Sequence, residues 1–211
     1  MVRTLLICLL LAVPAPASGQ RQRLEPVDQC ASDASFAAFR SELLAAIERR
    51  DVAFILASVA DDISVDFGGG SGRDDFRRAW GLDRPEGSDL WRELGAALRL
   101  GCARDGESLW APSLFRQLEH ADDPTGVLVA IGAGGVLRAA PSDAAPAIAQ
   151  LDWDVLAWRS AESPEDWLPV ALADGRSGFV RRGQVRGLLD YRAGFARVGG
   201  RWRMTVFIAG D

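Results

Sequence analysis

The stretch G-G-V-L-R-A-A-P-S at residues 134–142, followed by D-W-L-P-V at 166–170 and D-G-R-S-G-F-V at 174–180, decides the fold of the middle of the chain. Short runs of β-branched, aliphatic and aromatic residues separated by polar or small ones are typical of short strands. Asp174 and Gly175 lie between two such runs and are typical of a hairpin turn. Short strands at this spacing predict a small β-barrel, which we expect over residues 127–186.

The same three segments resemble landmarks of the bacterial SH3 (SH3b-like) domain. L-R-A-A-P-S corresponds to its usual V-R-x-x-P-S, D-W-L-P-V to its W-x-x-V strand, and D-G-R-S-G-F-V to its D-G-x-x-G-W-V ending. The chain departs from the family at Ala140, where Gly is common, and at Phe179, where Trp is common. The first departure alters a loop, whereas the second preserves an aromatic ring.

Domains of this family occur mostly in exported proteins, where they are thought to bind peptides or cell-wall fragments. The resemblance therefore implies a recognition groove on the module. Its predicted aromatic residues are Trp158, Trp167 and Phe179, flanked by Asp143 and Asp166. The alternative is that these aromatic rings fill the core of a barrel that is too small to spare any.

The C-terminal residues predict a second β-structure. Residues 191–198 and 201–208 flank Gly199 and Gly200, a two-residue turn that tightens a hairpin. This register pairs Arg197 with Trp202, Phe195 with Met204 and Ala193 with Val206, and it allows Arg197 to lie over Trp202. One face then carries Tyr191, Phe195, Trp202, Met204, Val206 and Ile208. Because a lone hairpin is marginal in water, this face must be buried against another element.

The N-terminal region predicts four helices and one clear strand. The first helix is capped by Ser32, Asp33 or Ser35, and Asp51 caps a shorter second helix through Ala60. A strand follows in which Ile63, Val65 and Phe67 alternate with polar residues, then a helix ending at Gly81 and another that starts at Ser88 and carries the apolar stripe Leu90, Leu94, Ala97 and Leu98.

The strand at 63–67 lacks a partner, and the terminal hairpin lacks a sheet. We therefore expect the hairpin to return to this strand, which gives an α+β domain from residues 30–118 with 188–211 and places the SH3-like barrel between its two parts. This order of elements also resembles the NTF2-like fold, although several strands of that fold are missing.

Residues 1–17 combine Arg3, an apolar run and small residues at Ala15 and Ala17, as in a secretory signal peptide. We therefore expect a periplasmic or secreted protein, with no transmembrane segment. Cleavage would leave two cysteines, Cys30 and Cys102, which in an oxidising compartment predict one disulfide. Residues 18–29 are expected to be a loosely held lead-in.

The amino-acid composition excludes several kinds of catalytic and binding site. All 24 basic residues are Arg, which excludes Schiff-base catalysis and the phosphate-loop lysine. The single histidine, His120, lies in a polar linker, so no metal site or cofactor is expected. The net charge of -5 disfavours nucleic acid as a partner. Residues 174–203 nevertheless hold eight arginines against two acids. They could meet an anionic partner, although we favour a solvated face that pairs with the acidic remainder.

These observations favour a non-catalytic exported binding protein whose partner is a peptide, a peptidoglycan fragment or an envelope protein. The first alternative is an NTF2-like small-molecule or enzymatic domain with an accessory SH3-like module, in which a carboxylate pair could act as acid and base. The second is a structural subunit of an envelope assembly that recruits a partner by strand addition.

Overall fold

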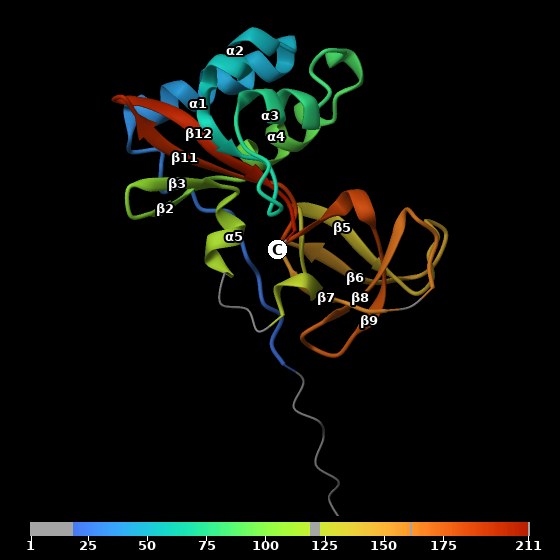
Figure 1. Cartoon of the computed structure of the whole chain (residues 1–211). Helices are drawn as coiled ribbons and strands as arrows, with labels where there is room; N and C mark the ends of the chain where they lie inside the picture. The colour runs from blue at the N-terminus through green and yellow to red at the C-terminus, as the bar shows by residue number, and fades with distance from the viewer. Residues whose placement is uncertain (1–18, 119–122, 161, 211) are drawn as a thin grey trace, which may run out of the picture.

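The computed structural model describes residues 19–118, 123–160 and 162–210. Helices and strands are mixed in the α+β manner, and the strands form two separate sheets. Figure 1 shows the first sheet beneath the N-terminal helices and the second sheet beside them. The proposed signal peptide and His120 lie outside the described residues. Among the residues described, no helix is both long and apolar enough to cross a membrane.

The first sheet joins the two ends of the chain. Its strand order is β1-β12-β11-β3-β2. The bounds are Val59–Ser64 for β1, Ala103–Asp105 for β2, Ser108–Ala111 for β3, Arg192–Val198 for β11 and Arg201–Ile208 for β12. β1 runs parallel to β12, with Val59 opposite Met204, so the predicted return of the terminal hairpin to the N-terminal strand is confirmed.

The helices cover this sheet. They are α1 (Ala34–Arg49), α2 (Val52–Ser58), α3 (Arg73–Ala79), α4 (Leu90–Arg99) and the short α5 (Ser113–Gln117). Of the three predicted capping residues of α1, Asp33 is the one that accepts hydrogen bonds from the first-turn N–H groups, and Asp51 caps α2 as predicted. The predicted apolar stripe of α4 is buried. The ring of Phe36 in α1 contacts Phe195 in β11 at a centroid distance of 5.3 Å, which fixes this helix against the sheet.

Two predictions about the N-terminal strand were wrong. The strand begins at Val59, within the predicted second helix, and it ends at Ser64. It stops there because the chain turns back: the Val65 N–H donates to the Gly70 carbonyl, and Asp66 accepts from the Gly70 N–H at 2.8 Å. Phe67 therefore lies in an exposed loop and not on a half-buried strand.

The expectation of a single N-terminal strand was also wrong, because the β2–β3 hairpin adds two more. Its strands are only three and four residues long, and β3 pairs with β11. The turn at Gly106, with φ of +57°, is a signal that the sequence carries.

The terminal hairpin follows the predicted register only near its turn. Arg197 faces Trp202 and Phe195 faces Met204 as predicted, and the Arg197 guanidinium lies 4.7 Å from the Trp202 ring centroid. An irregularity between Gly194 and Phe195 then shifts the pairing by one residue, so Ala193 faces Phe207 and not Val206. The shift places Phe207, and not Val206, in the core.

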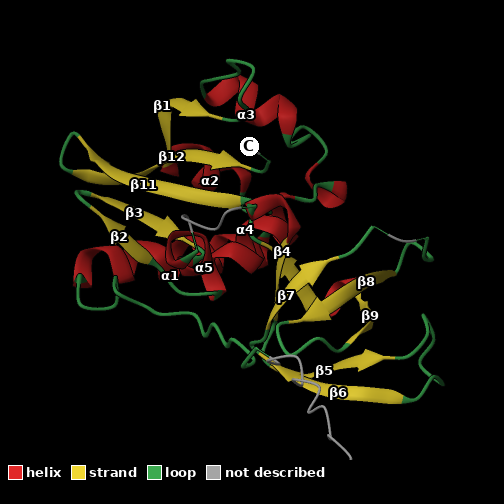
Figure 2. Cartoon of the chain, turned by 90° about the horizontal axis from the view of Figure 1, so that it is seen from below, coloured by secondary structure: helices red, strands yellow, loops and turns green. Residues whose placement is uncertain are grey.

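The second sheet covers the segment predicted to form a small barrel, residues 127–186, and it does contain short strands, but a closed barrel is not seen in the described residues. Its strands are β4 (Val127–Ala130), β5 (Ala133–Arg138), β6 (Ala147–Asp152), β7 (Val155–Trp158), β8 (Trp167–Leu172), β9 (Ser177–Arg181) and β10 (Val185–Gly187). Their order is β10-β4-β7-β8-β9-β5-β6, so within the described residues the sheet is open, with β10 and β6 as its outer strands. Figure 2 shows this sheet to one side of the first one, as a separate layer.

The N-terminal segment, residues 21–29, is held in place and is not the loose lead-in that the sequence predicts. At one end, the Val155 N–H donates to the Gln22 carbonyl and the Arg21 side chain forms an ion pair with Asp154. At the other end, the Gln29 N–H donates to the Cys102 carbonyl at 2.8 Å. This segment therefore touches both the second sheet and the helical part of the protein.

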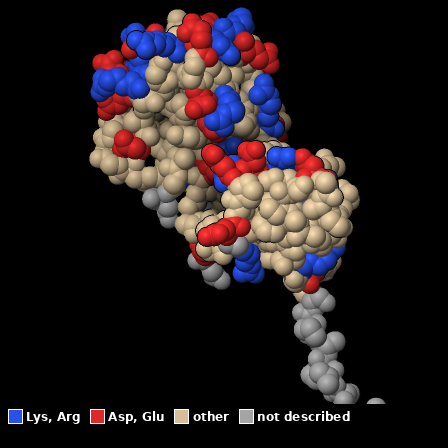
Figure 3. Space-filling view, turned by 90° about the vertical axis from the view of Figure 1, so that its right-hand side faces the viewer, with Lys and Arg blue, Asp and Glu red and all other residues tan. Residues whose placement is uncertain are grey.

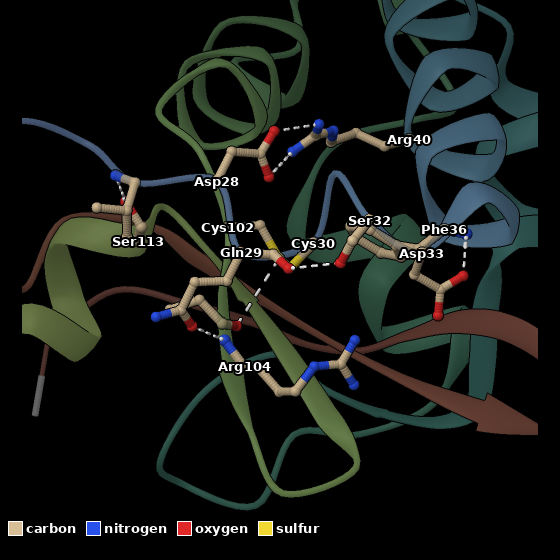
Figure 4. Close-up of a disulfide and its surroundings, with 12 residues drawn as sticks. Asp28, Gln29, Cys30, Ser32, Asp33, Phe36, Arg40, Cys102, Arg104 and Ser113 are labelled. Atoms are coloured by element: carbon tan, nitrogen blue, oxygen red, sulfur yellow. Dashed lines mark hydrogen bonds and ion pairs between the residues drawn. A yellow bond between two sulfur atoms is a disulfide. The ribbon is translucent and has the colours of Figure 1, made fainter.

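The predicted disulfide between Cys30 and Cys102 is present, with a Cα–Cα distance of 5.6 Å. Figure 4 shows its surroundings, in which Asp28 forms an ion pair with Arg40 of α1 and the Gln29 side chain accepts from the Arg104 N–H at 2.8 Å. Both cysteines are fully buried. The disulfide thus joins the end of the N-terminal segment to the start of β2.

Candidate functional site

Three of the five predicted ligand-binding residues meet at one arginine on the second sheet. Trp167 begins β8 and stands opposite Arg181 at the end of β9. The Arg181 guanidinium stacks over the Trp167 ring at 4.6 Å from its centroid. Trp167 itself is buried, so this ring supports the guanidinium instead of standing free in a groove.

Asp143 and Asp166 flank the same guanidinium. Asp143 accepts two hydrogen bonds from Arg181, from Nε to Oδ1 at 3.2 Å and from Nη2 to Oδ2. Asp166 is more distant, with Oδ2 at 3.8 Å from Nη1. The hydrogen bonds from Arg181 lower the pKa of the Asp143 carboxyl, and the same pairing raises the pKa of Arg181. Both carboxylates remain largely open to solvent.

Phe179 joins this surface and Trp158 does not. Phe179 pairs with Pro169 and lies two residues from Arg181, so it shares the Arg181 face of the sheet and is half-buried there. Trp158 pairs with Val170, whose side chain lies in the core of the opposite face. Trp158 is 46% exposed at the end of β7. The three aromatic residues therefore do not form one groove. We name the assembled set, Asp143, Asp166, Trp167, Phe179 and Arg181, the Arg181 cluster.

Arg181 was missed as a site residue in the sequence, although a signal for it exists. A hairpin turn at Asp174 and Gly175 fixes the register of β8 and β9, which places Trp167 opposite Arg181. The structure brings Asp143 to the same point from the loop between β5 and β6.

A cleft adjoins the Arg181 cluster. It has a volume of about 930 Å³ and lies between α4 and the segment from β9 to Tyr191. Figure 3 shows charged side chains of both signs gathered where the two parts of the molecule meet. Five arginines and three acids line this cleft: Arg92, Arg99, Arg181, Arg182, Arg186, Glu93, Asp166 and Asp190.

The described residues contain no group of three or more His, Cys, Asp or Glu side chains that could hold a metal ion. Comparisons of this chain with protein-family models, with curated proteins and with solved structures found no match. The functional interpretation therefore depends on the residues and geometry described above.

Proposed function

We propose that this is an exported, non-catalytic binding protein whose SH3-like module, residues 127–186, recognises a peptide or a peptidoglycan-derived ligand. We infer that residues 30–118 and 188–211 form the domain that carries this module. The observation that supports the proposal best is the Arg181 cluster, in which a guanidinium and two exposed carboxylates meet over the buried ring of Trp167.

The cluster matches the chemistry of a short peptide. Peptides, including those of the cell wall, carry both ammonium and carboxylate groups. Asp143 and Asp166 are exposed acceptors for an ammonium group. Nε and Nη2 of Arg181 donate to Asp143, which leaves Nη1 as the donor for a ligand carboxylate. The half-buried ring of Phe179 offers an apolar contact beside them. Because Arg181 is held by Trp167 and Asp143, the donor is positioned before a ligand arrives.

The strand-addition alternative is less well supported. The outer strands β6 and β10 are the places where an added strand could pair. On the longer of them, β6, two carbonyls already accept hydrogen bonds from arginine side chains. Arg21 donates to the Gln150 carbonyl at 2.7 Å, and Arg176 donates to the Ile148 carbonyl at 3.4 Å. Side chains that cover an edge strand in this way hinder pairing with another chain.

The test is a calorimetric titration of the disulfide-intact protein with disaccharide-tetrapeptide muropeptides and with purified peptidoglycan. We expect saturable binding that weakens at least about fivefold in the double variant Asp143→Asn, Asp166→Asn, because two charge-assisted contacts are lost. Asp62→Asn is the matched control, since it removes an exposed carboxylate from β1 on the other sheet. Trp158→Ala is expected to bind normally, because Trp158 lies on the opposite face.

Two results would contradict the proposal. One is the absence of binding to either ligand. The other is binding that the Asp143→Asn, Asp166→Asn protein retains in full while remaining folded by circular dichroism.

A further inference from the structure

Arg186 in β10 is a buried cation that lines the cleft. Only 7% of this residue is exposed, and its Nη2 donates to the Tyr191 carbonyl. No carboxylate of the described residues forms an ion pair with it. Asp190 and Glu93 interact with Arg186 only electrostatically, which favours its charged form. Burial has the larger effect and lowers the pKa of Arg186. A buried charge without an ion-pair partner is costly, so the structure holds a cation that an incoming anion would stabilise.

Arg182 is a second cation of this cleft without an ion pair among the described residues. It is exposed, and its Nε donates to the Glu165 carbonyl at 2.9 Å. The other three arginines of the cleft are already paired: Arg92 with Asp89 and Glu93, Arg99 with Glu48, and Arg181 with Asp143. The uncompensated charge therefore suits one anionic group better than a polyanion.

Besides the arginines and the acids Glu93, Asp166 and Asp190, the lining contains apolar side chains. Ile131, Val185 and Leu100 are half-buried and line the cleft with Arg186. Arg186 is fixed in position, because β10 pairs with β4 and Arg186 stands opposite Val129. The volume of this cleft lies in the range of small-molecule sites, and its lining offers both charged and apolar side chains to a ligand.

We propose that this cleft binds a small organic anion, whose carboxylate or phosphate contacts Arg186 and Arg182 and whose apolar part lies against Ile131, Val185 and Leu100. The guanidinium group suits both headgroups, because its planar N–H donors match carboxylate and phosphate oxygens in pairs. The ligand would contact α4 and β10 together, and so it would bridge the two parts of the protein. This inference does not rest on the function proposed for the Arg181 cluster.

The test uses three probes that each have a six-carbon chain and differ in their headgroup: hexanoate, hexyl phosphate and hexanamide. Each is titrated into the disulfide-intact protein by calorimetry and by ¹H–¹⁵N NMR. We expect at least one anion to bind saturably and to shift the amide signals of Ile131, Val185 and Arg186, with an affinity that falls as NaCl is added. The neutral amide should bind at least about tenfold more weakly, because it lacks the charge-assisted hydrogen bonds. Whichever anion binds more tightly identifies the headgroup.

Two variants locate the site. Arg186→Met keeps the length and the apolar stem of the side chain, and it should weaken anion binding about tenfold or more. Arg182→Gln should weaken it severalfold, whereas Arg104→Gln, which removes an exposed arginine from β2, should leave it unchanged. If Arg186→Met fails to fold, Arg182→Gln and the NMR shifts decide. Equal binding of all three probes, or full anion affinity in folded Arg182→Gln and Arg186→Met proteins, would overturn the proposal.

Discussion

The ion pair between Arg21 and Asp154 should hold the N-terminal segment to the second sheet. Asp154 is 1% exposed, and its carboxylate accepts from Arg21 Nε at 2.7 Å and also from Nη2. The Asp152 N–H is its other donor, at 2.8 Å. The change Arg21→Gln removes the only cation that pairs with this carboxylate among the described residues. Removing one partner of a fully buried pair costs about 3–5 kcal/mol. Because the Arg21 side chain is 32% exposed, we expect a smaller loss, about 2 kcal/mol.

Urea unfolding at neutral pH measures this loss as a change in midpoint at constant slope. Arg23→Gln is the matched control, because Arg23 lies on the same segment but pairs with Asp152 at the surface, and its loss should cost less than about 0.5 kcal/mol. The coupling should appear in a double-mutant cycle with Asp154→Asn. A loss for Arg21→Gln as small as that for Arg23→Gln would refute the reasoning, since it would mean that the buried carboxylate does not need its partner.

Three further predictions concern stability. Replacing both Cys30 and Cys102 by Ser opens a link across 72 residues and should lower the free energy of unfolding by about 4 kcal/mol, measured in urea against the oxidised protein. Asp51→Ala removes the cap of α2 and should cost about 1 kcal/mol in the same assay, and no loss would mean that the cap is not formed in solution. Folding lowers the pKa values of Asp33 and Asp143 below the ordinary 3.8, chiefly through hydrogen bonds from Ser35 and Arg181 respectively. Their contribution should be complete above the ordinary pKa and be lost as the pH falls through the folded values, so urea midpoints that rise on acidification below pH ~4 would contradict it.

The terminal hairpin shows where sequence patterns stop being sufficient. Its Gly-Gly turn fixes the pairing of nearby residues, and that part of the predicted register is confirmed. The irregularity at Gly194 depends instead on a distant strand. A Cβ atom at Gly194 would come within 3.2 Å of the Trp110 ring, so this close approach favours glycine, and the pairing changes beside it. Periodicity within the hairpin carries no information about Trp110, which is why the burial of Phe207 was missed.

The Arg181 cluster could be predicted in part, because a local turn sets the register of β8 and β9. The pairing also puts Trp158 and Phe179 on opposite faces of the sheet, because their partners, Val170 and Pro169, are adjacent in β8. This alternation could have been derived from the sequence once the strand pairing was assumed. The cleft could not be predicted in this way. Its walls are α4 and β10, and their approach depends on how the two sheets and the N-terminal segment pack.

The arginine-rich stretch at 174–203 illustrates this difference. The sequence left two interpretations open, an anionic partner or pairing with the acidic remainder. Arg181 and Arg197 pair with acids outside the stretch, Asp143 and Asp33, which supports the second interpretation for them, whereas Arg176 pairs with Asp174 inside it. Arg186 and Arg201 have no ion pair among the described residues, but Arg201 is exposed to water whereas Arg186 is buried. Water solvates the charge of Arg201, whereas the buried charge of Arg186 lacks this stabilisation. Burial therefore distinguishes Arg186 from Arg201, and Arg186 is the one for which we propose an anionic partner.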